Sequence, residues 1–337
     1  MTIALLTGTY SKFSGIDRVV ERQADQLIRE GHQVTVVCFD GDIQSDRYRI
    51  IKLGMPNSLL GQRIYRLCIF CLSPKAISKA MTEIRKVDKV YSHQYPMNCL
   101  AISMKQQWST RYVYYNHGVP PARFFSSNAE KLYIWIFRWL TNRSVKKADE
   151  VISISQYLRD VLKKETNLDS RVMPDQIDEV RFNKNITDQS IRQKLSLGDG
   201  PVFLSVGRIS PHKGWHLLIS AFNQVKQQLL KAQLIIVGKP TFPGYLDKLK
   251  KMSQGSVHFV GFVSDEDLPK YYSSCDCYVT ASLWEGFNLP LAEAQAMGKP
   301  VVAFNLGPHP EVAKNGLLVE PLNTEAFAQA MIQQIKK

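Results

Sequence analysis

The sequence predicts an α/β protein made of two doubly wound domains in tandem. Short β-rich runs alternate with amphipathic helix-like runs, a polar stretch interrupts this pattern near the middle, and a second alternating series follows. Such alternation is typical of parallel sheets covered by helices. The chain has 337 residues, 45% of them hydrophobic, which is enough for two domains with sizeable cores.

The first series predicts the N-terminal domain. Its expected strands are Ile3–Thr7, Val34–Phe39, Lys89–Ser92, Tyr112–Asn116 and Val151–Ser155, and its expected helices are Arg18–Glu30, Met97–Gln107 and Glu130–Lys147. The polar interruption runs from Asn167 to Pro201 and contains Pro174 and a Gly-Asp-Gly cluster, as domain connections often do. We therefore divide the chain into domains 1–175 and 176–337.

The second series predicts another sheet of the same kind. Its expected strands are Val202–Val206, Leu234–Val237, Val257–Val260, Tyr278–Ala281, Val301–Phe304 and Leu317–Val319. No run of 18 apolar residues occurs, so no membrane-spanning helix is expected. The six cysteines are scattered, and Cys68 and Cys71 form a C-x-x-C with no second ligand pair nearby. We interpret them as reduced core residues, which favours an intracellular protein.

Positive charge is concentrated in one part of the chain. Residues 51–150 carry 16 Lys and Arg against 5 Asp and Glu, so they supply +11 of the net charge of +13. A single-sign field of this kind predicts an anionic partner, such as lipid head groups, a diphosphate-linked acceptor or nucleic acid. Nucleic acid is the least favoured of these, because no RNA- or DNA-binding module is recognisable.

The stretch from Glu285 to Glu293 is the strongest functional signal. A strand-like run leads into it and a helix-like run, Leu289–Met297, leads out, so Glu285 is expected at the carboxyl end of a strand and Glu293 about one turn into a helix. The helix start offers free backbone N–H groups and a positive dipole end, which suit a phosphate. A carboxylate on that helix can accept two hydrogen bonds from a vicinal diol such as a ribose. The simpler alternative is that both glutamates are solvated.

A second signal lies in the loop after the first strand of the second domain. Arg208 and Lys213 belong to this one loop, Ser205–Gly214, and can converge on one anion. Arginine offers a forked donor and lysine a point charge. The alternative is that both are ordinary surface charges.

Together these motifs resemble a known family of enzymes. The spacing Glu285-x7-Glu293 followed by Gly298-Lys299-Pro300, with the Gly-Arg-x4-Lys-Gly pattern at residues 207–214, resembles the retaining glycosyltransferases of the GT-B fold, family 4 (group 1) type. The resemblance implies two Rossmann-like domains facing each other across a cleft, the N-terminal one binding the acceptor and the C-terminal one the nucleotide-sugar donor. The chain departs from the family at Pro174–Asp178, where the usual Pro-Asn-Gly-x-Asp lacks its glycine.

The resemblance also implies roles for individual residues of the second domain. Gly207, Arg208 and Lys213 would hold the donor diphosphate, Glu285 would orient the donor sugar, and Glu293 would bind the ribose. The helix start, Gly286, Phe287, Asn288 and Leu289, would contribute backbone donors to the diphosphate, and Gly261, Phe262 and Val263 would face the nucleobase. Asp265-Glu266-Asp267 looks like a metal-binding D-x-D, but we expect it to start a helix at Leu268–Ser273. No metal and no cofactor are expected.

In the first domain, two strand ends are candidates. The loop Gly8–Gly15 has two glycines too far apart for G-x-G-x-x-G, which disfavours a nicotinamide or flavin enzyme. Gly15 at a helix start would let a phosphate or sugar approach the backbone, although turn chemistry alone could explain it. His117 follows a strand, and the family has a donor-sugar contact at this place; a buried structural histidine is the alternative. For His93 we favour the structural role.

The region 123–147 combines six basic residues and one acid with many aromatic residues. Leu132, Ile136 and Trp139 share one helical face, which we expect to pack on the sheet. The other interpretation is that the aromatic and basic side chains lie on an anionic membrane surface.

The predicted function is transfer of a sugar from a UDP- or GDP-sugar, with retention and without a metal, to a glycan or lipid-linked acceptor. Arg208, Lys213 and the helix start would stabilise the departing diphosphate, with Glu285 and His117 at the sugar. This suits polysaccharide or glycolipid biosynthesis in the cytoplasm, at the inner face of the membrane. The alternatives are a nucleotide-sugar epimerase on the same scaffold and a catalytically silent sugar-nucleotide- or polysaccharide-binding protein.

Overall fold

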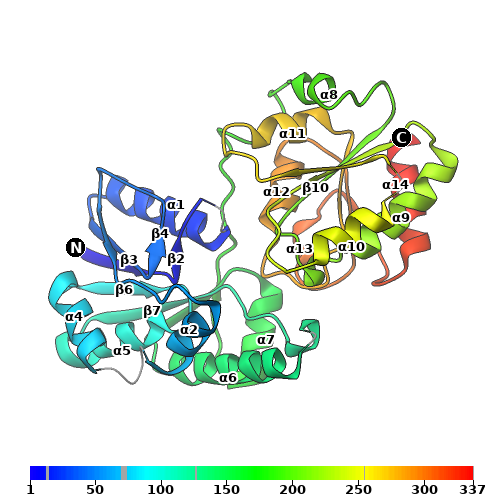
Figure 1. Ribbon diagram of the computed structural model, residues 1–337. Helices are drawn as coiled ribbons and strands as arrows, with labels where there is room; N and C mark the ends of the chain where they lie inside the picture. The colour runs from blue at the N-terminus through cyan, green and yellow to red at the C-terminus, as the bar shows by residue number, and fades with distance from the viewer. Residues whose placement is uncertain (13–14, 70–73, 126, 254, 337) are drawn as a thin grey trace. The chain divides into compact units, whose positions relative to one another are not determined.

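Each half of the chain forms one large parallel β-sheet with helices on both faces, as the computed structural model shows (Figure 1). The structure describes residues 1–12, 15–69, 74–125, 127–253 and 255–336. The chain divides into a first unit, Met1–Asp175, and a second unit, Gln176–Lys337.

The sheet of the first unit has seven strands in the order β5-β3-β1-β6-β7-β8-β9, and all neighbours are parallel. The strands are β1 (Thr2–Leu6), β3 (Gln33–Cys38), β5 (Arg49–Lys52), β6 (Lys89–Ser92), β7 (Arg111–Asn116), β8 (Glu150–Ser153) and β9 (Arg171–Val172). A two-stranded ribbon of β2 (Thr9–Tyr10) and β4 (Asp40–Gly41) extends it. The edge strands β5 and β9 and this ribbon were not predicted, because short edge strands lack the long apolar run of a central parallel strand.

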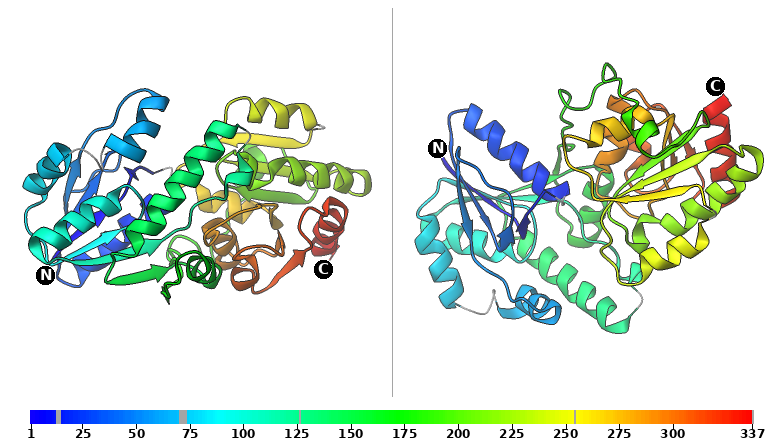
Figure 2. Two further views of the ribbon diagram at one scale, coloured as in Figure 1. Left: turned by 90° about the horizontal axis from the view of Figure 1, so that it is seen from below. Right: turned by 45° about the horizontal axis from the view of Figure 1, so that its top comes forward.

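Helices cover both faces of this sheet. Helix α1 (Gly15–Arg29) lies on one face, and α4 (Pro74–Ile84), α5 (Met97–Trp108), α6 (Asn128–Val145) and α7 (Gln156–Thr166) lie on the other (Figures 1 and 2). Helix α2 (Leu59–Ile64) and the π-helical turn η1 (Tyr65–Ile69) precede α4, and the short η2 (Ala122–Phe124) precedes α6. The core under α4, α5 and α7 contains a cluster of buried hydrophobic residues, with Leu6, Val90, Leu100 and Tyr112 at 0% exposure.

The sheet of the second unit has six strands in the order β12-β11-β10-β13-β14-β15, again all parallel. They are β10 (Val202–Val206), β11 (Gln233–Val237), β12 (Val257–Gly261), β13 (Cys277–Thr280), β14 (Val301–Phe304) and β15 (Gly316–Val319). Helices α9 (Trp215–Gln228), α10 (Tyr245–Met252) and α14 (Thr324–Lys336) share one core cluster, and α8 (Ser190–Lys194), α11 (Leu268–Ser274), α12 (Leu289–Ala296) and α13 (His309–Val312) share another. The short turn η3 (Pro211–Lys213) joins β10 to α9. All six strands match the sequence prediction within about one residue at each end.

Both sheets reverse their strand order near the middle. In the first unit the reversal falls between β1 and β6, and in the second it falls between β10 and β13. At such a point the loops leaving the carboxyl ends of two adjacent strands diverge to opposite faces, and ligands bind there in open α/β sheets. The two reversals therefore mark where each unit can present functional side chains.

Helix α6 does not pack as predicted. Leu132 is 57% exposed and Trp139 51% exposed, so the expectation that their face lies on the sheet is wrong. The inward face is instead the one with Phe137, whose ring packs edge-on against Tyr95, and the buried Thr141 and Ser144. Small polar residues at these inward positions hid the true core face from a hydrophobicity argument.

Two further predictions concern cysteines and membrane spans. Of the C-x-x-C pair, Cys71 lies outside the described residues, as does the side chain of Cys68. Within the described chain, no helix combines the length and apolar character needed to cross a bilayer.

Candidate functional site

Lys213 and Glu285 meet at the strand-order reversal of the second unit. Lys213 belongs to η3 after β10, and Glu285 to the loop between β13 and α12. The ammonium Nζ lies 2.6 Å from one carboxylate oxygen of Glu285 and 2.8 Å from the other. Glu285 is 8% exposed, so this is a buried ion pair and not a surface contact.

Backbone geometry explains how the lysine reaches this position. Gly214 has a φ of +65°, and a Cβ at this residue would lie 1.8 Å from the carbonyl oxygen of Ala281, so only glycine fits. The amide of Leu283 donates to the carbonyl of His212 at 2.8 Å, and the indole of Trp215 donates to the carbonyl of Arg208 at 2.9 Å. These contacts hold the Arg208–Gly214 loop against the end of β13.

The electrostatics of this loop show which charges lie together. Burial alone would raise the pKa of Glu285, but the Lys213 ammonium outweighs it, and the pKa is lowered. Burial, and after it the charges of Lys213 and Arg208, lowers the pKa of His212 to about 3, while Glu285 acts in the opposite direction. The charges of Arg208, Lys213 and Glu285 all influence the buried imidazole of His212. That Arg208 and Lys213 converge on one anion stays a prediction.

The start of helix α12 is fixed by an asparagine and a histidine. Asn288 has a φ of +80°, and its side-chain oxygen accepts from the amide of Leu291 at 3.3 Å. His309 donates from Nδ1 to the carbonyl of Phe304 at 2.8 Å, so its Nε2 accepts from the Asn288 amide at 2.9 Å. Burial lowers the pKa of His309 and keeps it neutral for this role. His309 was not predicted from the sequence. The pattern that could have pointed to it is a histidine between two prolines, shortly after a strand.

Glu293 is buried on the same helix. It is 4% exposed and accepts a hydrogen bond of 2.9 Å from the hydroxyl of Tyr272. Burial, and then the charges of Glu285 and Glu293, raises the pKa of Tyr278, so both glutamates lie near one phenol. The alternative that these glutamates are solvated surface residues is therefore wrong.

The loop after β12 carries the remaining candidates of the second unit. Gly261 has a φ of +75°, and the Phe262 side chain beyond it is 44% exposed. Asp265 lies 3.5 Å from Arg181, and Asp267 lies 2.8 Å from Lys270. Asp267 is the N-cap residue directly before α11, so a helix begins here as predicted, but its side chain makes no capping bond. Among the described residues, no group of three or more His, Cys, Asp and Glu side chains is arranged to hold a metal ion.

In the first unit, two histidines at neighbouring strand ends contact each other. His93 follows β6 and His117 follows β7, and Nδ1 of His93 lies 2.9 Å from Nε2 of His117. Nε2 of His93 lies 2.9 Å from the side-chain oxygen of Gln23 on α1. His93 is 0% and His117 6% exposed, and burial lowers the pKa of His117 to about 3.

The turn after β7 fixes the position of His117. The amide of the Asn116 side chain donates to Ser153 at 3.1 Å, and its oxygen accepts from the backbone of Gly118 at 3.1 Å. Tyr115 stacks on His93 with ring centroids 5.0 Å apart. The imidazole of His117 is thus held by the turn and by its bonded neighbour.

Gly15 begins α1 next to a buried carboxylate. A Cβ at Gly15 would meet no atom within 4 Å among the described residues, so open space lies beside this residue. Asp17, which the sequence analysis did not assign, is fully buried and accepts from Thr9 Oγ1 at 2.9 Å and from the amide of Ser11 at 2.9 Å. It ties the loop after β1 to the start of α1.

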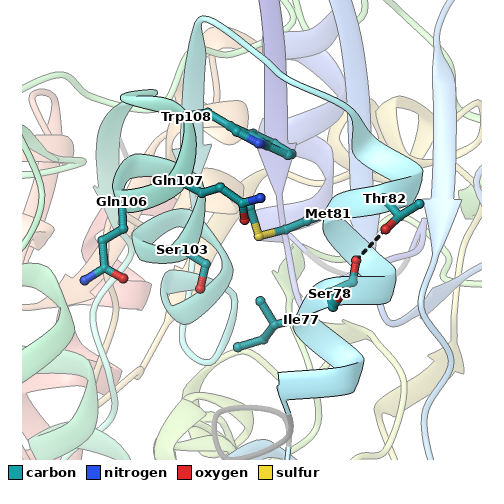
Figure 3. A pocket seen from close by; sticks show the side chains of 8 residues that line it. All are labelled: Ile77, Ser78, Met81, Thr82, Ser103, Gln106, Gln107 and Trp108. Carbon is teal, nitrogen blue, oxygen red and sulfur yellow. Dashed lines mark hydrogen bonds between the residues drawn. The ribbon is translucent and has the colours of Figure 1, made fainter.

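A pocket of about 580 Å³ lies elsewhere in the first unit, between α4 and α5 (Figure 3). Trp108 and Met81 face it from the two helices, and Ser78 and Thr82 form one rim, joined by a 2.9 Å bond from the Thr82 hydroxyl to the Ser78 carbonyl. None of the residues predicted for the site lines this pocket.

Comparison with known proteins identifies the family. The family model described as Glycosyltransferase Family 4 matches residues 13–181, and the model described as Glycosyl transferases group 1 matches residues 187–337. The chain belongs to glycosyltransferase family 4. The resemblance inferred from the two glutamates and the Gly-Arg-x4-Lys-Gly pattern is thereby confirmed.

Two relatives align with most of this glycosyltransferase, and a third aligns with about half of it. An uncharacterized glycosyltransferase of Methanocaldococcus jannaschii is 25% identical over 97% of this chain and 87% of its own. The alpha-monoglucosyldiacylglycerol synthase of Streptococcus pneumoniae is 26% identical over 90% of this chain and 71% of its own. A GDP-mannose-dependent phosphatidylinositol monomannoside mannosyltransferase of Mycobacterium tuberculosis is 28% identical over 48% of this chain and 45% of its own.

Solved structures share the fold. The sucrose-phosphate synthase of Thermosynechococcus elongatus aligns with a TM-score of 0.80 at 22% identity, covering 100% of this chain and 90% of the other. The Anabaena protein HepE, in complex with UDP and glucose, aligns with a TM-score of 0.80 at 22% identity, covering 99% and 90%. The glycosyltransferase has the GT-B fold, as predicted.

Proposed function

We propose that this glycosyltransferase transfers a sugar from a UDP- or GDP-sugar to a glycan or lipid-linked acceptor, with retention at the anomeric carbon and without a metal ion. The observation that carries the proposal is the Lys213–Glu285 pair with Arg208 beside it, at the point where the strand order of the second sheet reverses. Expelling an anionic diphosphate is the electrostatic problem of the reaction, and fixed cations and backbone donors can meet it.

The second unit supplies groups of suitable chemistry for each part of a donor. We assign Arg208, Lys213, Gly207 and the N-terminus of α12 to the diphosphate, because they offer positive charge and free backbone N–H groups. We assign Glu285 to the sugar hydroxyls, Glu293 to the ribose diol, and the loop Gly261–Val263 to the base. A diphosphate would compete with Glu285 for the Lys213 ammonium, which would release a carboxylate oxygen to accept from the sugar.

In the first unit, we assign Gly15 and His117 to substrate contact. Gly15 begins α1 after the loop that follows β1, and His117 follows β7; ligands bind beyond the carboxyl ends of such strands in doubly wound folds. The open space beside Gly15, where a Cβ would meet no described atom within 4 Å, supports this role.

The relatives support the choice of donor and acceptor classes. HepE was solved with UDP-glucose, and the Mycobacterium tuberculosis relative is named for GDP-mannose. That relative is named for a lipid that it mannosylates, a phosphatidylinositol monomannoside, and the Streptococcus pneumoniae relative is named for a lipid that it makes, a monoglucosyldiacylglycerol. We therefore favour a lipid-linked acceptor.

A surface of the first unit supports membrane association at the inner face of the membrane. Leu60, Ile64, Leu132, Trp135 and Trp139 of α2 and α6 are between 46% and 69% exposed. The two helices are adjacent, because Arg63 of α2 pairs with Glu130 of α6 at 2.8 Å. We call these five residues the α2–α6 apolar surface. Exposed aromatic side chains with basic neighbours, such as Arg143 over the Trp139 ring, suit an anionic interface.

The decisive experiment is a panel of UDP- and GDP-hexoses with lipid extract as acceptor, following nucleoside diphosphate release. Nuclear magnetic resonance of the product reports the anomeric configuration and would also reveal an epimerised donor. Glu293→Gln should weaken donor binding, whereas Tyr272→Phe keeps the carboxylate and serves as the matched control. If no nucleotide sugar binds or reacts, the proposal is wrong. An unaltered affinity in Glu293→Gln would remove Glu293 from the ribose site.

A further inference from the structure

Gln23, His93 and His117 form one chain of side chains in the first unit. The chain begins on helix α1, passes the end of β6 and finishes at the end of β7, with both nitrogen contacts at 2.9 Å. Among the described residues, Nδ1 of His117 has no hydrogen-bond partner, and it is not among the fully buried unpartnered atoms. The last nitrogen of the chain is therefore open to a ligand.

The direction of the hydrogen bonds follows from the first member. The Gln23 atom in contact is the carbonyl oxygen Oε1, which can only accept, so Nε2 of His93 carries the proton. A neutral imidazole has one N–H, so Nδ1 of His93 is an acceptor, and Nε2 of His117 must donate to it. Nδ1 of His117 then holds a lone pair.

We infer that Gln23 and His93 are positioning residues that fix the tautomer of His117, so that its Nδ1 accepts a hydrogen bond from a sugar hydroxyl of the substrate. This inference rests on the proposed function and assigns the chemistry of one of its contacts. A hydroxyl can donate to the lone pair, whereas a carboxylate or an ether oxygen cannot. The chain therefore selects a hydroxyl-bearing substrate at this point.

Burial supports this single arrangement. It lowers the pKa of His117 to about 3 and that of His93 well below its ordinary value, so both rings are neutral near pH 7. Tyr115 stacks on His93 and, with centroids 6.2 Å apart, on His117. This stacking opposes a half-turn of either ring about its Cβ–Cγ bond, which would put carbon atoms where Nδ1 and Nε2 now lie.

A spectroscopic test needs no substrate. Full-length protein labelled with ¹⁵N-histidine would show the protonation of each ring nitrogen in two-bond correlation spectra, with His93→Asn and His117→Asn used to assign the signals. We expect protonated Nε2 and unprotonated Nδ1 on both rings. Gln23→Met should remove this preference on His117, and Gln23→Glu should keep it because a carboxylate oxygen also accepts. A proton on Nδ1 of His117, or an unchanged spectrum in Gln23→Met, would overturn the inference.

Turnover gives the second test. Gln23→Met should lower kcat/KM about tenfold, the size expected when a buried donor loses its acceptor, and Gln23→Glu should restore most of it. Gln26→Met is the matched control, since Gln26 is exposed on the same helix and bonds Glu30. With donors lacking one hydroxyl at a time, Gln23→Met and His117→Phe should lose discrimination at the same hydroxyl. Discrimination lost at different hydroxyls would contradict a shared role.

Failure of the proposed function can be distinguished from failure of the inference about the His117 tautomer. If no donor in the panel reacts, the proposed function fails, while the nitrogen spectra still decide whether Gln23 and His93 set the tautomer. If donors react but the spectra show the opposite tautomer, only the inference fails.

Discussion

Each unit buries a carboxylate next to its strand-order reversal, but the two are stabilised differently. Asp17 of the first unit accepts from hydroxyl and amide donors, and burial still raises its pKa to about 6. Glu285 of the second unit is paired with the Lys213 ammonium, and its pKa is lowered despite burial. The neutral donors around Asp17 thus do not offset its desolvation, whereas Lys213, with a smaller contribution from the Ser282 hydrogen bond, offsets that of Glu285. The first unit presents neutral hydrogen-bonding groups and the second presents a compensated charge.

The largest effect is expected from breaking the ion pair. Lys213→Met leaves Glu285 buried without a cation and should lower the free energy of unfolding by about 3–5 kcal/mol. The double variant Lys213→Met/Glu285→Gln should recover most of this stability. Turnover should stay low in both, by about 2–4 kcal/mol of transition-state stabilisation, because the donor has lost a cation.

Urea unfolding and steady-state rates check both parts. Lys231→Met is the control, because Lys231 pairs with Asp199 in a solvent-exposed ion pair of the same unit, which contributes at most about 1 kcal/mol. A double variant with normal turnover would show that Lys213 has only a structural role.

The second-largest effect is a pH dependence of stability, which should have opposite signs in the two units. Because the folded pKa of Asp17 is raised from 3.8 to about 6, its contribution to stability is complete below pH 3.8 and is lost as the pH rises to about 6, at a cost of roughly 3 kcal/mol. The pKa of Glu285 is lowered from 4.5, so its contribution is present above pH 4.5 and is lost as the pH falls below it. Acidification from pH 6 to pH 4 should thus stabilise the first unit locally.

Hydrogen exchange of peptides from β1 and α1, corrected for its intrinsic pH dependence, measures this. Asp17→Asn should flatten the change, because it removes the titrating group. The same profile in wild type and Asp17→Asn would assign the pH dependence to another group.

A smaller effect on stability is expected from Asn288, which caps the start of α12. Asn288→Ala should lower the free energy of unfolding by about 1–2 kcal/mol, because it removes the helix cap and leaves a non-glycine residue at positive φ. Asn288→Gly removes the same side chain but relieves the backbone, so it should cost less. Equal losses in chemical denaturation would mean that backbone conformation does not contribute.

The smallest effect on stability is expected at the surfaces. Trp135→Gln and Trp139→Gln should change the free energy of unfolding by less than about 0.5 kcal/mol, because both side chains are exposed. Both should nevertheless reduce sedimentation with vesicles containing anionic lipid, and high salt should reduce it in the wild type. Leu322→Gln is the control, since Leu322 is 62% exposed and belongs to the second unit. If the wild type does not sediment at low salt, the α2–α6 apolar surface is not a membrane contact.

The central strands and the family could be predicted from the sequence, because buried parallel strands are long apolar runs and the Glu285–Glu293 spacing is specific. The edge strands β5 and β9 could not be predicted from the sequence, because two of the four residues of β5 are charged and β9 has only two residues. The sequence placed Lys213 and Glu285 in separate loops with separate roles, and only the strand order of the sheet brings them to 2.6 Å.

Other features depend on contacts between residues far apart in the chain. Gln23 and His93 are 70 positions apart, so no local pattern joins them. The inward face of α6 is lined by Thr141 and Ser144, which no apolar periodicity marks. Burial of Asp17 follows from hydrogen bonds with Thr7, Thr9 and Ser11 of the loop after β1, which no local sequence pattern marks.

The indole that secures the Arg208 carbonyl gives the enzyme an intrinsic optical reporter. Trp215 is 2% exposed and begins α9 directly after the loop that carries both cations, and Trp284 lies edge-on to His212 of that loop, with ring centroids 6.4 Å apart. Any ligand that draws Lys213 away from Glu285 must disturb the surroundings of these two fluorophores. Emission spectra of unlabelled protein can therefore follow occupancy of the loop in real time.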